Sequence, residues 1–326
     1  MIQLHIEETN DESTAVKNKA VELGYWKDPY IKYFSKGQVD RPAPEINLGY
    51  YLRVVTFRHI QKRFIESFKV SQIVNLGCGF DTTFLYLLDD LDECKLTCTY
   101  VELDLDNVVG RKIECIRGHK VIYDKLLKIP SFSSVGGCGD DADKCASNCR
   151  RLICKSYKLL ACDLSTVSRA DFSNLMFSIC KLDPSIPTLF ISECVLVYLE
   201  PNQSQRLLNN IASLFSQAVF LLYEQVNIDD NFGRLMIENF KNKGCPLQGV
   251  DVCFSKESQL NRFKDAGFTH VNICTAQELW EKLDRKEVER INSIDRLDEM
   301  ELLVMLLQHY CFVIAFNFDC QIMSIL

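Results

Sequence analysis

The hydrophobic positions along the chain follow two different patterns. Residues 1–65 read mostly as amphipathic helix, with a break at "RPAPEIN", where two prolines interrupt the pattern. From residue 70 onward, short apolar runs alternate with amphipathic segments. Seven of these runs predict β-strands: "SQIVNLG", "LTCTYVELD", "SYKLLACD", "PTLFISECVLVY", "QAVFLLYEQV", "FTHVNICT" and "HYCFVIAFNF". Strands that alternate with helices favour an α/β fold with a parallel, doubly wound sheet.

Two of the other segments predict helices most clearly. In "PNQSQRLLNNIASLF", the apolar positions recur at helical spacing, and Pro201 stands where a helix can begin. The run "DEMELLVMLLQ" predicts a second helix directly before the last strand. Between residues 125 and 155, by contrast, Gly, Ser and Asp are frequent, which indicates a long surface insertion.

Composition narrows the classes of function. The chain has 326 residues, of which 47% are hydrophobic and 25% charged, values typical of a globular protein with a large core. A formal net charge of −7 disfavours nucleic acid or an anionic membrane as a partner, because both attract positive surfaces. No apolar run reaches the roughly 18–20 residues of a membrane span, and the N-terminus lacks the features of a signal peptide. We therefore expect a cytoplasmic protein, and by default a monomer.

The 16 cysteines fit a reducing compartment. Several lie inside apolar runs, where cysteine acts as a small hydrophobic residue. One cluster, Cys138, Cys145, Cys149 and Cys154, has the composition of a metal site, but it lacks the paired C-x-x-C spacing of zinc sites. We expect a thiol-rich loop there and no metal.

The stretch "IVNLGCGFDTT" carries the first sign of a ligand site. It reads as a strand, a tight Gly77-Cys78-Gly79 turn and a helix, in which the glycines let the backbone approach a ligand closely. A dinucleotide fingerprint needs a third glycine where Thr82 stands, so a nicotinamide dehydrogenase is disfavoured.

Acidic residues follow the next three predicted strands. Asp104 follows Gly77 at about the spacing at which an acid reaches a ribose hydroxyl, and Asp163 ends the third strand. Glu193 interrupts the fourth apolar run, where a carboxylate should be paired or functional. Asp163 can equally serve only as a local cap. Acids around a Gly-x-Gly turn suit a ligand with hydroxyls, an ammonium and no phosphate, and S-adenosylmethionine has these properties.

The motifs together resemble those of the leucine carboxyl methyltransferases. The similar segments run from about residue 12 to about residue 314 and are "GYWKDPYI", "APEINLGYYLR", "NLGCGFDTT", "ISECVLVYLEP", "YEQVN" and "LDEMELL". The resemblance implies a class I, Rossmann-like methyltransferase that depends on S-adenosylmethionine, with a seven-stranded, mostly parallel sheet. It further implies an N-terminal helical cap over 1–66 and a core over 67–326 with inserted lid segments near 125–158 and 227–258.

The resemblance also assigns roles to single residues. Gly77 would lie in the cofactor turn, Asp104 would meet the ribose, and Asp163 with Leu164 would flank the adenine. The remaining cofactor positions and the candidate substrate contact lie elsewhere in the chain: Glu193 at the methionine end, Arg53 and Lys17 on the cap, and Tyr198 beside the acceptor.

The acceptor that the resemblance implies is the C-terminal leucine of a type 2A protein phosphatase catalytic subunit. The partner would be recognised through its C-terminal tail, with its active-site face as a further contact, and its methylation would regulate phosphatase assembly. A C-terminal carboxylate, with a pKa of about 3.3–3.7, is already ionised at neutral pH, so the transfer needs orientation and no general base. Arg53, Lys17 and Tyr198 are the candidates for that orientation, with Arg53 and Tyr198 as the catalytic pair. Which cation binds the cofactor carboxylate and which the acceptor stays open.

Two features depart from the family pattern. Leu48 stands where the family often has an arginine, and the Cys- and Gly-rich segment near 131–150 matches nothing in the family. Two alternatives therefore stay open. One is a related carboxyl or O-methyltransferase with another acceptor, such as a tRNA-modifying relative, and the other is a catalytically silent scaffold that binds the phosphatase.

Overall fold

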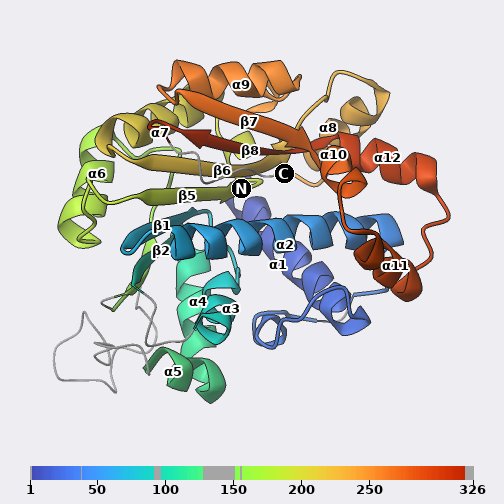
Figure 1. The fold of residues 1–326 in the computed structure, drawn as a ribbon, viewed down its shortest axis with the longest axis horizontal. Coiled ribbons are helices and arrows are strands. Elements are labelled where there is room, and N and C mark those ends of the chain that lie inside the picture. Colours follow the sequence, from blue (N-terminus) through green and yellow to red (C-terminus); the bar gives the residue numbers. More distant parts are fainter. Residues whose placement is uncertain (1, 38, 92–96, 128–150, 155, 320–326) are drawn as a thin grey trace.

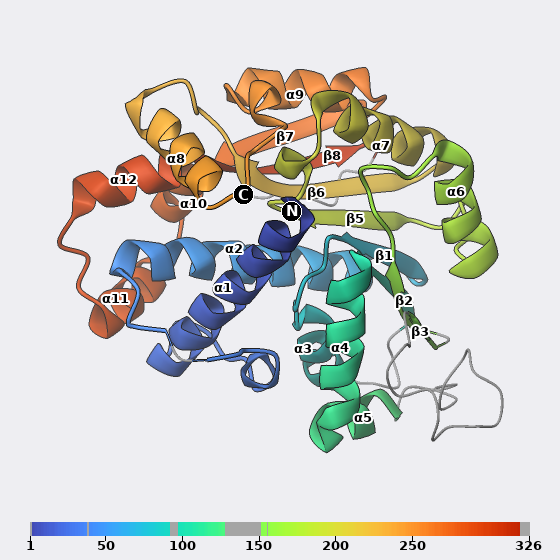
Figure 2. The same cartoon turned by 180° about the vertical axis from the view of Figure 1, so that it is seen from behind.

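The structure, a computed structural model, describes residues 2–37, 39–91, 97–127, 151–154 and 156–319. Helices cover both faces of a central sheet, as Figure 1 shows from one side and Figure 2 from behind. The α/β fold expected from the alternating pattern is confirmed.

The sheet has eight strands in the order β3-β4-β2-β1-β5-β6-β8-β7. Neighbouring strands from β4 to β6 pair in parallel, while β3, β7 and β8 pair antiparallel with their neighbours. The bounds are β1 Ser71–Leu76, β2 Cys98–Asp104, β3 Arg151–Ile153, β4 Tyr157–Ala161, β5 Thr188–Glu193, β6 Ala218–Gln225, β7 His270–Thr275 and β8 Tyr310–Phe316. The chain places β2 and β4 on one side of β1 and then returns to place β5 on the other, so a topological switch point lies between β1 and β5.

The central strands are apolar on both sides because both faces are covered. In β1, Ile73 joins one core cluster and its neighbour Val74 joins the other, and every residue of this strand is buried. The first cluster includes apolar residues of α1 to α5, α11 and α12, and the second those of α6, α7 and α9. The helices are α1 Ile2–Leu23, α2 Pro44–Ser67, α3 Thr83–Asp90, α4 Asp106–Gly118, α5 Lys120–Leu127, α6 Arg169–Ser173, α7 Pro201–Leu214, α8 Asn231–Asn242, α9 Lys256–Asp265, α10 Ala276–Glu281, α11 Arg285–Ile294 and α12 Met300–Gln308.

The predicted N-terminal helices are present. Figure 2 shows α1 lying across α2, with α2 running beside the sheet. The proline-rich break lies between the two helices, and Pro44 is the first residue of α2. Leu48 on α2, which stands where the family often has an arginine, is fully buried in the core. Its side chain thus packs among apolar residues at this position. The division into a cap over 1–66 and a core from 67 falls at the end of α2 and stays a prediction.

The expected strand count was one too low. The eighth strand, β3, has three residues and pairs antiparallel with β4 at the edge of the sheet. It lies inside the segment 125–158 that the sequence indicates as an insertion, and a run this short shows no period-2 pattern that could reveal it. Most of that insertion, including Cys138, Cys145 and Cys149, lies outside the described residues, while Cys154 is buried.

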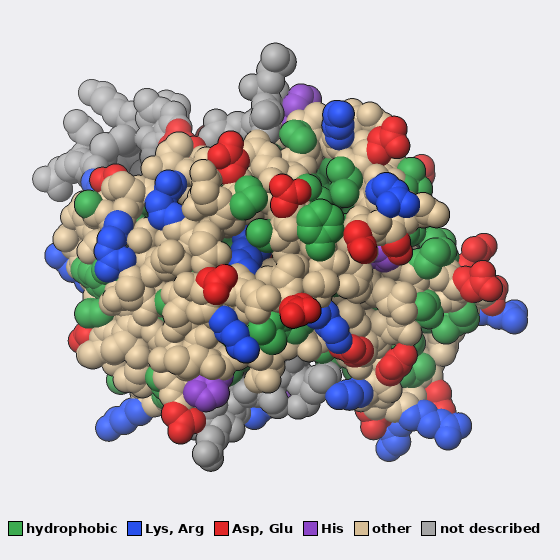
Figure 3. All heavy atoms as spheres, turned by 90° about the horizontal axis from the view of Figure 1, so that it is seen from above, with side chains coloured by type: hydrophobic (Ala, Val, Ile, Leu, Met, Phe, Trp, Pro, Cys, Tyr) green, Lys and Arg blue, Asp and Glu red, His purple; other side chains and the backbone are tan. Residues whose placement is uncertain are grey.

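The second predicted insertion, 227–258, contains α8 and a short 3-10 turn, η5, Val250–Val252. Its apolar residues form a separate small cluster with Val197, the residue before Tyr198. Among the described residues, none of the helices combines the length and the apolar character needed to cross a membrane. On the face in Figure 3, Lys and Arg side chains alternate with Asp and Glu, with no large area of one sign.

Candidate active site

The glycine turn follows β1 at the switch point of the sheet. Gly77 and Gly79 have positive φ angles of 68° and 48°, a region that L-residues with side chains rarely adopt. A Cβ atom on Gly77 would overlap the side chain of Val195, and one on Gly79 would overlap Asn10. The turn is therefore closed to any larger residue, and it leaves room for a ligand directly above the backbone.

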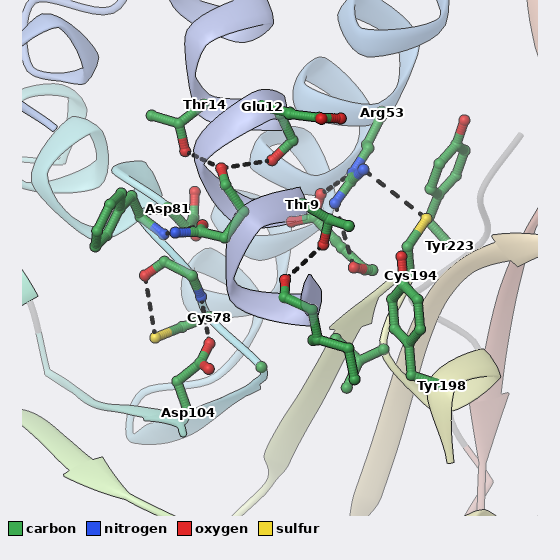
Figure 4. Close-up of a pocket in the computed structure, with 18 of the residues that line it drawn as sticks. Thr9, Glu12, Thr14, Arg53, Cys78, Asp81, Asp104, Cys194, Tyr198 and Tyr223 are labelled. Atoms are coloured by element: carbon green, nitrogen blue, oxygen red, sulfur yellow. Dashed lines mark hydrogen bonds and ion pairs between the residues drawn. The ribbon is translucent and has the colours of Figure 1, made fainter. Parts of the chain in front are cut away.

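A cavity of about 1110 Å³ opens above this turn. Pockets that hold one small ligand occupy roughly 300–1,000 Å³, so this one has room for a cofactor and part of an acceptor. Figure 4 shows Asp104 and Cys78 on one side of it and Arg53, Tyr198 and Tyr223 on the other. All eight residues that the sequence assigned to the site line this one cavity: Lys17, Arg53, Gly77, Asp104, Asp163, Leu164, Glu193 and Tyr198.

Asp104 ends β2 and supports the glycine turn. Its carboxylate accepts hydrogen bonds from the backbone N–H of Gly79 (2.6 Å) and from that of Leu105 (2.7 Å). Burial raises the pKa of Asp104 above its ordinary value, although these two N–H donors oppose the shift. The free lone pairs of the carboxylate remain available for a hydroxyl donor in the cavity.

Asp163 and Leu164 follow β4 at the same edge of the sheet. Asp163 accepts hydrogen bonds from the backbone N–H (2.9 Å) and the hydroxyl (2.6 Å) of Ser165, so the capping role considered for it is present. Both residues also line the cavity, and Leu164 presents an apolar, 5% exposed side chain. Asp163 thus caps the turn after β4 and also lies at the cavity wall.

Arg53 on α2 pairs with Glu193 at the end of β5. The guanidinium Nε donates to a Glu193 carboxylate oxygen at 2.5 Å, and Nη2 donates to the Glu193 backbone carbonyl at 3.2 Å. The guanidinium also lies over the rings of Tyr50 and Tyr223. Burial lowers the pKa of Arg53, but the neighbouring Cys194 and Glu193 more than offset it, so the pKa stays above its ordinary value. Of the two expectations for Glu193, paired or functional, the pairing is present and the function stays a prediction.

The chain is strained directly after Glu193. Cys194 has a φ of 54°, which is unfavourable for a residue with a side chain, and its N–H donates to the Tyr223 carbonyl at 2.8 Å. Residues held in such conformations concentrate at functional sites, because the surrounding structure must enforce them. The turn ends β5 earlier than the apolar run suggests and leads into a 3-10 turn, η4, Leu196–Tyr198.

Lys17 on α1 contributes a second cation to the cavity. Within the described part of the chain, its ammonium makes no ion pair or hydrogen bond with a carboxylate. Burial and the positive charge of Arg53 lower the pKa of Lys17, and the charge of Glu193 opposes them. Among the described residues, Arg53 is thus paired with Glu193, while the Lys17 ammonium is available to a further anion.

Tyr198 lies at the opposite end of the cavity from Asp104 (Figure 4). Its ring meets that of Phe240 on α8 edge-on, at 6.4 Å between centroids. Burial raises the pKa of Tyr198, so its hydroxyl keeps its proton and can donate to an acceptor oxygen. Tyr223 and Tyr310 stack nearby at 5.1 Å. This end of the cavity is therefore aromatic, with hydroxyl groups at its wall.

The sequence analysis missed several supporting contacts. Asn10 on α1 accepts a hydrogen bond from the Phe80 N–H at 3.0 Å, which joins the first helix to the glycine turn. Asp28, in the "GYWKDPY" motif, accepts from the guanidinium of Arg58 (2.5 Å) and the hydroxyl of Thr82 (2.6 Å). Asp28 lies in a motif that the sequence analysis quoted without naming this residue, whereas no local pattern indicates Asn10.

Helix α1 also connects two sides of the cavity. Glu7 accepts a hydrogen bond from Asn107 on α4 at 2.5 Å. On the other side, Glu12 pairs with Lys243, just after α8, at 2.7 Å. The helix thus crosses the cavity between α4 and the 227–258 segment, and its Lys17 lines the space beneath.

Comparison with known proteins agrees with this geometry. The family model for leucine carboxyl methyltransferases matches residues 12–212. The chain belongs to the leucine carboxyl methyltransferase family. Leucine carboxyl methyltransferase 1 of Bos taurus is 38% identical over 304 residues, which cover 93% of this chain and 87% of that protein. The enzyme of the same name from Caenorhabditis elegans is 38% identical over 317 residues, covering 95% and 90%.

The chain is also similar to proteins outside the leucine carboxyl methyltransferases. The human tRNA wybutosine-synthesizing protein 4 is 29% identical over 317 residues, which cover 95% of this chain but 43% of that protein. Among solved structures, phosphoethanolamine N-methyltransferase 2 of Haemonchus contortus, in complex with S-adenosylhomocysteine, has a TM-score of 0.51 at 10% identity, covering 98% of this chain and 61% of that one. A methyltransferase from Thermobifida fusca has a TM-score of 0.50 at 13% identity, covering 94% of each chain. These structures confirm the methyltransferase fold.

Proposed function

We propose that the chain transfers a methyl group from S-adenosylmethionine to the α-carboxylate of a C-terminal leucine and forms a methyl ester. The observation that carries the proposal is the arrangement of Lys17 and Arg53 around Glu193, on the wall of a cavity that also contains the glycine turn. Arg53 pairs with Glu193, whereas the Lys17 ammonium has no ion pair among the described residues, so a ligand carboxylate is a suitable partner for it.

The residues present fit S-adenosylmethionine. The acids Asp104 and Asp163 would repel a phosphate but can accept hydrogen bonds from hydroxyl and amino groups. We place the ribose at Asp104 and the adenine at Asp163 and Leu164. The methionine end would lie against Glu193, with Lys17 beside its carboxylate. Gly77 permits the close approach of the cofactor, since a side chain there would collide with Val195.

The transfer itself needs no proton movement at the enzyme. S-adenosylmethionine, when bound, supplies the methyl group as an electrophile on a sulfonium. The acceptor carboxylate oxygen forms a bond to the methyl carbon while the carbon–sulfur bond breaks and its electrons go to sulfur. The task of Arg53 and Tyr198 is to hold that oxygen in line with the methyl carbon, about 3–3.5 Å away, and to exclude water.

The acceptor that we infer is the catalytic subunit of a type 2A protein phosphatase. The aromatic end of the cavity, with Tyr198 and Phe240, suits an apolar terminal side chain, and the adjoining hydroxyls suit its carboxylate. A tail of a few residues fills only this end, so the folded phosphatase, including its active-site face, would supply further contacts. We place the reaction in the cytoplasm, where the described cysteines, all free thiols, would stay reduced.

Transfer of radiolabelled methyl to the purified phosphatase tests this function. The expected result is base-labile label on the intact protein and none on a version that lacks its last leucine. Calorimetry with S-adenosylmethionine should be run in parallel. Binding without transfer to the phosphatase would indicate a related methyltransferase with another acceptor, and absence of binding would favour a silent scaffold.

A further inference from the structure

A closed ring of hydrogen bonds lies behind the 3-10 turn that carries Tyr198. Val197 belongs to this ring through both its N–H and its carbonyl, and it is fully buried. The Val197 N–H donates to a carboxylate oxygen of Glu224 on β6 at 2.6 Å. The Val197 carbonyl accepts from the N–H of Gly249, in the 227–258 segment, at 2.8 Å. The residue that precedes Tyr198 is thus held from two sides by two different parts of the chain.

The rest of the ring joins those two parts. The other Glu224 oxygen accepts from Nη1 of Arg262 at 3.0 Å, and the same nitrogen donates to the Gln259 side-chain carbonyl at 3.3 Å. The Gln259 amide donates to the thiol sulfur of Cys253 at 3.5 Å, and this thiol contacts the Gly249 carbonyl at 3.6 Å. All of the side chains in the ring are buried.

Stability alone does not account for such a ring. A buried ion pair gains little over apolar residues of similar size, because both charges lose their hydration. In the described structure, two nitrogens of Arg262, Nε and Nη2, are buried without a hydrogen-bond partner, so this pair is not optimised for stability. What the pair does supply is a fixed carboxylate for the Val197 N–H.

The other side of the turn is equally constrained. A Cβ atom on Gly249 would lie 2.8 Å from the Leu199 carbonyl oxygen and 3.0 Å from that of Leu196. Both distances are too short for a comfortable contact, so the 227–258 segment can approach the turn this closely only with glycine. The position of Tyr198 therefore depends on the position of that segment.

We propose that Glu224 and Gly249 are positioning residues for the acceptor end of the cavity, acting on Tyr198 through the Val197 residue between them. The proposal rests on the function proposed above. Neither residue touches the cofactor end, where Gly77 and Asp104 lie. A change in the ring should consequently alter acceptor turnover and leave S-adenosylmethionine binding unchanged.

The double variant E224L/R262M tests the ring from the sheet side. It replaces the buried pair by apolar residues of similar size, which is often compatible with folding, and it removes the acceptor of the Val197 N–H. We expect kcat/KM for the phosphatase to fall about 10- to 100-fold, the effect typical of a misplaced contact group, with the Kd of S-adenosylmethionine within about threefold of wild type. The matched control is E102L/K112M, which removes another buried pair, joined at 2.7 Å, whose members do not line the cavity.

Gly249→Ala tests the ring from the 227–258 segment. If the double variant does not fold, this variant alone tests whether the ring positions Tyr198. It should show the same separation of acceptor kinetics from cofactor binding. Gly110→Ala is its control, because a Cβ atom on this helical glycine would meet nothing within 4 Å. Wild-type acceptor kinetics in Gly249→Ala, or an equal loss in E102L/K112M, would overturn the proposal. A wild-type protein that transfers no methyl to the phosphatase would instead refute the proposed function.

Discussion

Replacing Lys17 by methionine should weaken the binding of S-adenosylmethionine while making the ligand-free protein harder to unfold. Both effects come from the buried ammonium group of Lys17. Burial and the adjacent charge of Arg53 lower the pKa of Lys17 from 10.5, so the folded protein binds this proton less tightly than the unfolded chain does. The charged ammonium thus costs stability at neutral pH, and methionine, of similar length, removes that cost.

The effect on binding follows from the contact that is lost. A hydrogen bond to a charged partner is worth about 1.5–3 kcal/mol, and each 1.4 kcal/mol corresponds to a tenfold change in Kd. We therefore expect the Kd of S-adenosylmethionine to rise about 10- to 100-fold. The stability difference between variant and wild type should be largest at neutral pH and should shrink as the pH rises towards 10.5, where the unfolded chain also loses the proton.

Calorimetric titration and thermal unfolding, each with and without S-adenosylmethionine, measure both quantities. Lys19→Met is the matched control, since Lys19 lies on the same helix in a solvent-accessible pair with Glu22 at 3.2 Å and such pairs contribute at most about 1 kcal/mol. If Lys17→Met binds the cofactor as tightly as the wild type, the assignment of Lys17 to the cofactor carboxylate is wrong. If it unfolds at a lower temperature without ligand, the inferred stability cost of the buried ammonium is wrong.

Three further predictions concern the same cavity. Arg53→Lys keeps the charge but cannot reproduce the two-point contact with Glu193, so kcat/KM should fall at least about tenfold with the circular dichroism spectrum retained; unchanged kinetics would remove Arg53 from the site. Gly77→Ala should abolish cofactor binding in calorimetry, because its φ of 68° and the nearby Val195 leave no room for a methyl group, whereas retained binding would show that the turn can shift. The pH–rate profile should show no limb near the ordinary histidine pKa of about 6.5, because the described residues that line the cavity include no histidine; a limb at that pH would indicate a proton transfer that the proposed chemistry does not contain.

Much of the fold could be predicted because each strand is short, apolar and bounded by turn residues. All seven strand runs are strands, although the run that contains Glu193 ends there and continues as a 3-10 turn. The candidate site was predictable for a topological reason, since Gly77, Asp104 and Asp163 follow parallel strands whose carboxyl ends share one edge.

Contacts between residues far apart in the sequence could not be predicted from local sequence patterns. Asn10 and Phe80 are neighbours only because α1 folds over the glycine turn, and no local pattern encodes that approach. The ring around Val197 is similar, because nothing local to Glu224, in the "YEQVN" motif, indicates Arg262 as its partner. Periodicity identifies elements and the ends of strands, whereas the pairing of buried polar groups is set by tertiary packing.

The bridging position of α1 has a consequence for the rate of repeated turnover. The exchange of spent cofactor for fresh cofactor requires an exit, and α1 crosses the cavity between Asn107 on one side and Lys243 on the other. The Glu12–Lys243 pair is a surface ion pair, which contributes only about 0.2–1 kcal/mol, so this end of the crossing is weakly held. We expect higher ionic strength, which weakens the Glu12–Lys243 pair, to speed the exchange of spent for fresh cofactor.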